Sequence, residues 1–254
     1  MAENLCSPGA ISLLLVALIL CLTGWYGMLV SRGWRVLVCA VAQGETEAFR
    51  RATQRYGGML RKDGNLACSV LELLIGHNRV DFLPVLLQYQ SPEKLQTYRV
   101  EHMDPSLLRS VVTDGTPEML EALLMAGFDP MRDVESLWML CCEHCRVAHA
   151  RVLAKYGADY LSAVHREMLQ AGGGYISSLH AVVAGAMSKP LAALEMTRYL
   201  VCEHGENVNA PEADGRTVLD LLGDEQLCRC DNLEPLRSFL LAQGARYAKE
   251  LTVV

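Results

Sequence analysis

A glycine that follows an apolar helix face recurs along this 254-residue chain. Glycine adopts the left-handed backbone conformation at a helix C-terminus without steric cost, so each recurrence indicates the end of a helix. The residues five and four positions before these glycines are mostly apolar, which predicts a buried stripe in the same phase of each copy. A period of roughly 30 to 40 residues is typical of proteins built from repeated helix pairs. The recurring glycines are Gly57, Gly127, Gly157, Gly205 and Gly244.

The copies differ in polarity along the chain. One copy has Val85 and Leu86 in the stripe and Gln90 in the place of the glycine. The first copy has the polar Thr53 in its stripe and Gln54 beside it, as expected for a terminal repeat that lacks a neighbour on one side. The spacing predicts helix pairs near residues 34–42 and 45–56, 65–75 and 79–89, 106–113 and 117–126, 134–144 and 146–156, 177–187 and 191–204, and 216–222 and 233–243, with irregular segments at 89–105, 160–175 and 223–234.

Three segments carry motifs of a known family. Asn207–Leu222 contains Asp-Gly-Arg-Thr-Val-Leu, Ser178–Ala181 reads Ser-Leu-His-Ala, and Gly115–Gly127 begins Gly-Thr-Pro-Glu. On these residues the chain resembles the ankyrin repeats over about residues 34–248. The resemblance implies an all-α, ankyrin-type helix-pair solenoid of about six units that binds another protein through its concave face. Successive spacings of 30, 48 and 39 residues from Gly127 depart from the family period of about 33, so insertions are expected.

The N-terminal segment is apolar and free of charge between Glu3 and Arg32. Ala10 to Val30 supplies 21 mostly apolar residues, enough at a rise of about 1.5 Å per residue to cross a hydrocarbon layer of about 30 Å. We therefore predict a single transmembrane anchor in residues 1–33 and a degenerate, insertion-containing repeat domain in residues 34–254. A buried core helix is one alternative, and a signal peptide cleaved after Ala42 is the other.

The flanking charges predict the orientation of this anchor. Arg32, Arg35 and three further arginines follow the apolar run, whereas only Glu3 and the amino terminus precede it, so the positive-inside rule places the repeats in the cytosol. Ten irregularly spaced cysteines, including Cys202 in a stripe, are typical of reduced core residues. Without residues 1–42 the chain has 21 basic and 28 acidic residues, a net charge of −7, which gives no reason to expect nucleic acid or an anionic membrane surface as ligand.

Motifs for chemistry are scarce, and no cofactor is expected. The best metal candidate combines Cys141, Cys145 and His149, which would share a face if one helix ran through all three. The expected turn near residue 145 opposes this, so core or surface cysteines are the alternative. His180 lies at the histidine position of the resembled family, where a hydrogen bond between neighbouring loops is expected rather than catalysis.

These observations predict a binding protein and not an enzyme. The expected function is that of a membrane-anchored scaffold for another protein, whose identity the sequence does not give. Two alternatives are an immunity-type or inhibitor protein that neutralises a toxin or enzyme, and a Cys/His metal-binding protein. Trp138 has a second interpretation as a core residue. The residues expected to bind a partner, at the loop tips and on the inner helices, are Asp104, Asp129, Arg132, Trp138, Asp159, Tyr160, Asn209 and Asp214.

Overall fold

The structure is a computed structural model that describes residues 31–101, 106–132, 136–158, 177–212, 214–223 and 231–251. Within these ranges every residue belongs to a helix, a turn or a loop, and none belongs to a strand. This confirms the all-α prediction. Leu95 ends one compact unit and Gln96 begins the other.

The predicted anchor, Ala10 to Val30, lies outside the described residues. Among the helices that the structure describes, none combines the length and the apolar character needed to cross a membrane. The irregular segment predicted at 160–175 also lies outside the described ranges.

The first unit begins with a helix over residues 31–43 that runs into a turn at Gly44, where φ is +75°. Helix α2 packs on α3 and α4, and the Phe49 and Phe82 rings stack with their centroids 4.8 Å apart. Pro84 lies in the first turn of α4, where proline is tolerated. The elements are α2 (Thr46–Lys62), α3 (Gly64–Gly76), η2 (Val80–Phe82), α4 (Leu83–Leu86) and α5 (Pro92–Glu101), the last of which crosses the boundary at residue 95.

Two predictions for this unit are wrong. Gly57 lies inside α2 and does not end a helix. Glycine leaves room there for the Tyr89 ring, because a Cβ on Gly57 would lie 2.1 Å from Tyr89 Cε1. The segment predicted as irregular at 89–105 contains α5. Gln90, which stands in the place of the glycine, donates from Nε2 to the carbonyl oxygens of Leu60 and Arg61 at 2.8 and 3.0 Å. Its side chain therefore satisfies C-terminal carbonyls of α2.

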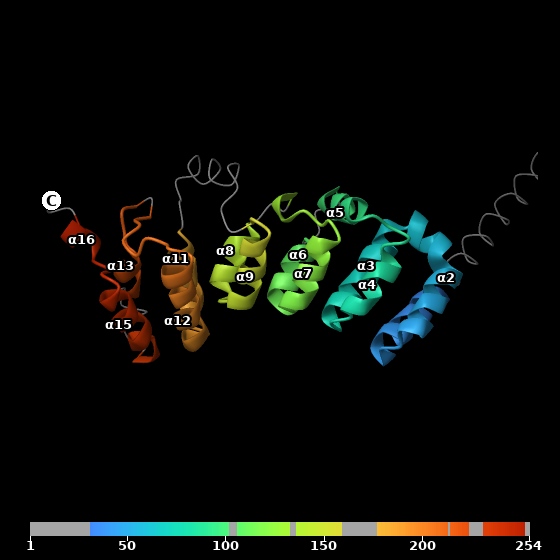
Figure 1. Cartoon of the computed structure of the whole chain (residues 1–254), viewed down its shortest axis with the longest axis horizontal. Coiled ribbons are helices and arrows are strands. Elements are labelled where there is room, and N and C mark those ends of the chain that lie inside the picture. Colours follow the sequence, from blue (N-terminus) through green and yellow to red (C-terminus); the bar gives the residue numbers. More distant parts are fainter. Residues whose placement is uncertain are drawn as a thin grey trace, which may run out of the picture. The chain divides into compact units, whose positions relative to one another are not determined.

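The second unit consists of helix pairs arranged in two layers. One layer is α6, α8, α11 and α13, and the other is α7, α9, α12 and α15, with each helix contacting its neighbours in its own layer. Figure 1 shows these pairs side by side in chain order. The predicted pairs are thereby confirmed to within a few residues. The bounds are α6 (Leu107–Asp114), α7 (Pro117–Met125), η3 (Pro130–Arg132), α8 (Leu137–Glu143), α9 (Val147–Lys155), α11 (Ser178–Ala186), α12 (Pro190–Arg198), η4 (Tyr199–Glu203), α13 (Val218–Leu222), η5 (Asp231–Leu233), α15 (Glu234–Ala242) and α16 (Ala248–Leu251).

Hydroxyl caps start the helices of the first layer, and glycines follow those of the second. The hydroxyls of Ser106, Ser136 and Ser177 each accept a backbone N–H three residues later, at the start of α6, α8 and α11. The second helices end as predicted from the recurring glycines. Their φ angles are +98° at Gly127, +69° at Gly157, +78° at Gly205 and +84° at Gly244.

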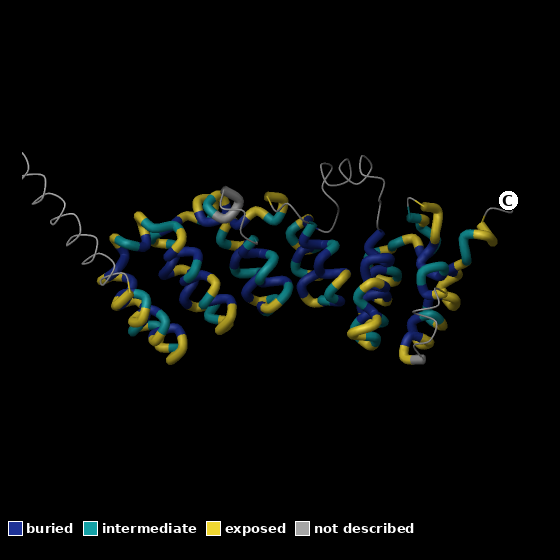
Figure 2. The backbone as a smooth tube through the Cα atoms, turned by 180° about the vertical axis from the view of Figure 1, so that it is seen from behind, coloured by how far each residue is buried: buried dark blue, intermediate teal, exposed yellow. Residues whose placement is uncertain are grey.

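The predicted stripes form the core of this unit. Leu123, Leu153 and Leu240 are fully buried, and Figure 2 shows the buried residues running along the facing sides of the helices. Cys202 is an exception, because it is exposed and not in the core as predicted. It lies in η4, a π-helical turn that continues α12. A π-turn holds one residue more than an α-turn, so it rotates the side chains after it out of phase with the stripe.

Candidate binding surface

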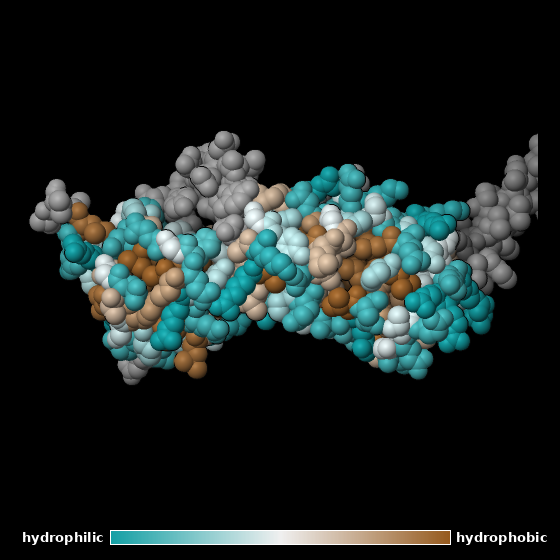
Figure 3. Space-filling view, in the orientation of Figure 1, coloured by the Kyte–Doolittle hydropathy of each residue, from teal (hydrophilic) through white to brown (hydrophobic). Residues whose placement is uncertain are grey.

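The turns between successive pairs emerge at one end of the second unit. Each pair is a helical hairpin, so the turn after every second helix lies at the end from which the next first helix starts. We call these the tip turns, and their described parts are residues 126–132, 156–158, 204–212 with 214–217, and 243–247. Two exposed apolar side chains lie elsewhere, at the α11–α12 turn, where Met187 is 52% and Leu191 79% exposed. Figure 3 shows the larger hydrophobic areas of this face over α3 and α4 and beside α13.

Asp129 occupies the first tip turn, and Gln96 holds its backbone. The Asp129 N–H donates to Gln96 Oε1, and Gln96 Nε2 donates to the Asp129 carbonyl, both at 3.0 Å. The Asp129 carboxylate accepts the Met131 N–H at 2.9 Å, and Arg132 Nη1 lies 3.4 Å from Thr97 Oγ1. Asp129 and Arg132 are both exposed, so the turn presents one acidic and one basic side chain on a fixed backbone.

Asn209 joins two tip turns in the same manner. Its Nδ2 donates to the Gly244 carbonyl at 3.0 Å, and its Oδ1 accepts the Arg246 N–H at 2.7 Å. The Asn209 N–H is itself held by Asn207 Oδ1 at 2.9 Å. Because both ends of its amide are engaged, Asn209 fixes the turn rather than offering a free group to a partner.

Asp214 is the most exposed acid in the longest described tip turn. Its carboxylate accepts the backbone N–H of Arg216 at 3.1 Å and the Arg216 guanidinium at 2.6 Å. These hydrogen bonds lower the pKa of Asp214. The turn is closed below it by the Glu212 N–H, which donates to the Arg216 carbonyl at 2.8 Å. Asp214 is therefore charged and presented on a closed loop at neutral pH.

His180 joins neighbouring pairs, as its position in the resembled motif led us to expect. Its Nε2 lies 3.3 Å from the Arg216 carbonyl, an acceptor, so Nε2 carries the proton. Nδ1 is then free to accept the hydroxyl of Ser177, the N-cap of α11. In α13 the N-cap is Thr217, and its hydroxyl lies 2.8 Å from both Asp220 Oδ2 and the Arg246 carbonyl. The N-cap regions of α11 and α13 thus each bond to a following tip turn.

Trp138 belongs to the core and not to the binding surface. Its side chain is 2% exposed, its Nε1 donates to Ser178 Oγ at 3.0 Å, and its ring lies 4.8 Å from that of His204. It stands in the third position of the capped helix start, where an apolar side chain packs inward. This observation favours the core interpretation and removes Trp138 from the contact residues.

The Cys/His candidates do not form a metal site. Helix α8 ends at Glu143 and α9 begins at Val147, and Cys145 between them has a φ of +53°, so no continuous helix aligns the three side chains. No three His, Cys, Asp or Glu side chains in the described ranges are placed to hold an ion. Burial also raises the pKa of Cys141, and it raises that of Cys145 to about 11, which opposes the thiolate form that binds zinc.

Two buried histidines make stability depend on pH. His149 is 3% and His180 2% exposed, and burial lowers the pKa of each. The unfolded chain therefore binds more protons than the folded chain below the ordinary histidine pKa of about 6.5. The free energy of unfolding is expected to fall as the pH is lowered from 7 towards 5, as measured by urea unfolding at each pH.

The variant His149→Gln isolates one of these contributions. Burial raises the pKa of Glu206, which works in the opposite direction, so the difference from the parent is more informative than the parent curve. The variant should lose less stability than the parent over the same interval. Identical slopes for the two proteins would show that His149 titrates normally.

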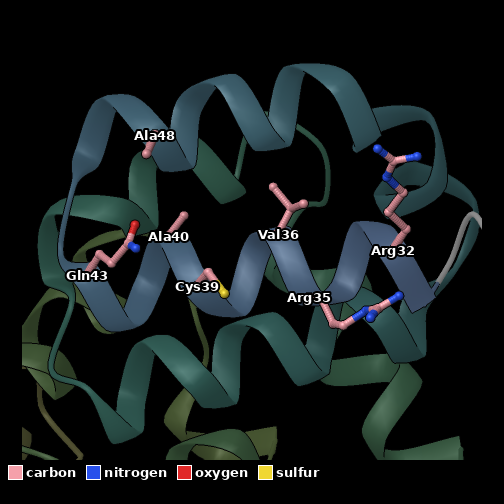
Figure 4. A pocket seen from close by; sticks show the side chains of 7 residues that line it. All are labelled: Arg32, Arg35, Val36, Cys39, Ala40, Gln43 and Ala48. Carbon is pink, nitrogen blue, oxygen red and sulfur yellow. The ribbon is translucent and has the colours of Figure 1, made fainter.

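The first unit contains a groove that was not predicted from the sequence. It lies between helix 31–43 and α2, and its volume is about 630 Å³. Figure 4 shows Val36 and Ala40 pointing towards α2, with Arg32 at the opposite end of the helix from Gln43. A sequence signal existed, because all but one of the lining residues recur at spacings of three and four along a single helix face. They are Arg32, Arg35, Val36, Cys39, Ala40 and Gln43, together with Ala48 of α2.

Three residues expected at the binding surface, Asp104, Asp159 and Tyr160, lie outside the described residues. Of the others, Asp129, Arg132 and Asp214 are brought to the tip turns with exposed side chains, and Asn209 joins two of these turns. Comparison of the chain with protein-family models, with curated proteins and with solved structures found no match.

Proposed function

We propose that this protein is a membrane-anchored, ankyrin-type repeat solenoid that binds another protein through its tip turns and first-layer helices. The observation that carries the proposal is the bond from His180 Nε2 to the Arg216 carbonyl, with Ser177 on the other ring nitrogen. It gives a physical reason for a histidine three residues after a helix cap. The acceptor of the His180 bond, Arg216, is the residue directly before Thr217, which is the N-cap of α13.

The remaining features support the same architecture. The two layers, the capped first helices and the positive-φ glycines recur with each pair of the second unit. Asn209 hydrogen-bonds to residues 35 and 37 positions later, and Gln96 to a residue 33 positions later. These separations are close to one repeat, although no copy carries the complete sequence motif. Stacked repeats of this kind usually present an extended surface for a partner.

Exposed charges on fixed turns favour binding over catalysis. Asp129 and Asp214 each use one carboxylate oxygen to accept a backbone N–H two residues later, which holds the turn, and Asp214 also pairs with the Arg216 guanidinium at 2.6 Å. Loop side chains on a rigid scaffold are a common means of recognition. The matching partner surface is expected to be basic opposite these two acids.

Anchoring and orientation are part of the proposal. Ala10 to Val30 would span the membrane once, and the arginines that follow it would keep the repeats in the cytosol. The partner is then a cytosolic protein or the cytosolic part of a membrane protein.

Site-specific photo-crosslinking in the native host tests the proposed surface. A photoreactive residue at Arg132, in a tip turn, should give a defined crosslinked product that mass spectrometry identifies. The same residue at Glu195, exposed on the second-layer helix α12, should give little of it. A product of equal yield from both positions, or from Glu195 alone, would contradict the proposed surface. A single dominant partner would favour the inhibitor alternative over a scaffold.

A further inference from the structure

The charge of the first helix pair is opposite to that of the rest of the chain. Residues 31–62 contain seven Arg or Lys residues and two Glu, a net charge of +5. Because the whole chain carries −6, the remaining residues together carry −11. All seven basic side chains are exposed. A local positive charge on an acidic protein points to an anionic ligand at that place.

The folding of the pair concentrates this charge at one end. A Cβ on Gly33 would lie 2.8 Å from the Tyr56 ring, so the start of helix 31–43 lies beside the C-terminal half of α2. The two acids, Glu45 and Glu47, are at the other end, next to the turn at residue 44. Asp63 follows α2 and uses its carboxylate to accept the Leu66 N–H at 3.0 Å. The basic residues gathered at the first end are Arg32, Arg35, Arg55, Arg61 and Lys62.

The groove is lined in part by this basic end. Arg32 and Arg35 line it, and neither guanidinium forms an ion pair with any residue in the described ranges. Arg35 Nε donates to the Ser31 carbonyl at 3.4 Å, which leaves its two terminal nitrogens for a ligand. Val36, 42% exposed, and Ala40 supply an apolar floor. Two guanidinium groups on one helix face suit a phosphate group.

The position of Arg32 and Arg35 along the chain indicates which molecule carries the phosphate. This step rests on the proposed anchor at Ala10 to Val30. Arg32 and Arg35 follow Val30 by two and five residues, which at about 1.5 Å per residue is roughly 3 and 7.5 Å along a helix. The headgroup layer on each side of a bilayer is about 5 to 8 Å thick. Both guanidinium groups would therefore lie at the depth of the lipid phosphates.

We propose that the basic end of the first helix pair binds the headgroup of an anionic phospholipid in the cytosolic leaflet. Arg32 and Arg35 hold the phosphate, and Arg55, Arg61 and Lys62 add attraction to the surface. Each basic residue near an anionic membrane adds about 1 kcal/mol to the attraction. The bound lipid fixes the first helix pair at the membrane.

Lipid retention by the full-length chain tests this proposal. The protein is purified in mixed micelles with equimolar phosphatidylcholine and phosphatidylserine, and the retained lipids are quantified by mass spectrometry. We expect phosphatidylserine to exceed phosphatidylcholine at least threefold in the parent and to fall close to the bulk ratio in Arg32→Gln/Arg35→Gln. Added salt should reduce the excess. The matched control is Arg50→Gln/Arg51→Gln, which removes the same charge from the other half of α2 and should keep the excess.

Three results would overturn the proposal: no excess in the parent, an equal loss in both double variants, or complete displacement of the lipid by low millimolar inorganic phosphate. The last would identify a site for a free anion. Alkaline carbonate extraction of host membranes tests the anchor separately, since all these variants retain residues 10–30. Release of the parent by carbonate would contradict the proposed anchor, while the micelle experiment would still decide whether the groove selects an anionic lipid.

Discussion

Gly185→Ala is expected to destabilise the second unit by about 2 to 3 kcal/mol. Gly185 lies in α11, and a Cβ at this position would be 1.8 Å from the carbonyl oxygen of Glu143, at the end of α8. The obstacle is backbone and cannot rotate away, so α8 and α11 must separate and lose packing between neighbouring pairs. In an open helix the same change would stabilise by about 0.5 to 1 kcal/mol, so the clash must reverse the sign. Urea unfolding of the detergent-solubilised chain measures the effect.

Gly58→Ala is the matched control for this substitution. Gly58 is also inside a helix, α2, but it is exposed and nothing lies within 4 Å of a Cβ placed there. It should gain about 0.5 to 1 kcal/mol. If Gly185→Ala stabilised the chain as much as Gly58→Ala does, α8 and α11 would not approach each other as closely as described.

Leu123→Ala is expected to cost about 2 to 5 kcal/mol, which is the usual range for a fully buried leucine. Leu123 is 0% exposed in α7, and its carbonyl accepts the Phe128 N–H at 3.1 Å in the turn that ends this helix. The loss combines the transfer free energy of the removed carbons with the cavity left where α7 contacts both α6 and α9. The shift of the urea midpoint and its slope measure the effect.

Thr53→Ala, at the corresponding position of the first copy, is the comparison for Leu123→Ala. Thr53 is also 0% exposed, but its hydroxyl donates within its own helix to the Arg50 carbonyl at 2.9 Å. The Thr53→Ala change removes fewer buried carbons, and the Arg50 carbonyl remains part of the helix. The expected loss of stability is therefore about 1 kcal/mol. Equal midpoints for Leu123→Ala and the parent would show that the repeat register is wrong.

Local signals explain why most helices were predictable from the sequence. The helices that end at residues 127, 157, 205 and 244 need a positive φ there, which glycine adopts without steric cost. This preference depends on the local backbone alone. Gly57 has the same spacing for a different reason, because the Tyr89 ring occupies the space that a Cβ on Gly57 would take. A tertiary contact of this kind leaves no periodic signal. The π-turn at Tyr199–Glu203 was equally hidden, and it moved Cys202 to the surface.

The binding surface was only partly predictable. The exposed acids Asp129 and Asp214 stand in turns that their residue types favour, because Asp accepts backbone N–H groups locally. The role of Gln96 was not evident from sequence, since its amide bonds to a residue 33 positions away. Trp138 was expected to bind a partner from an inner helix, whereas its burial follows from the packing of α8 on α11 and on the turn at His204.

Partner affinity after removal of two tip charges tests the central claim most directly. In Asp129→Asn/Asp214→Asn each side chain keeps an oxygen for the backbone N–H that it accepts, so the turns are retained while both charges are lost. Glu121→Gln/Glu203→Gln removes two charges from the second layer, where these residues pair with Lys155 and Arg151.

The measurement is the dissociation constant of the crosslinked partner for the parent and both variants. The tip variant should bind roughly three- to tenfold more weakly, and this difference should shrink with added salt, because exposed charge pairs contribute about 0.2 to 1 kcal/mol each. The second-layer variant should bind like the parent. Unchanged affinity in the tip variant, together with weaker binding in the second-layer variant, would contradict recognition through the tip turns.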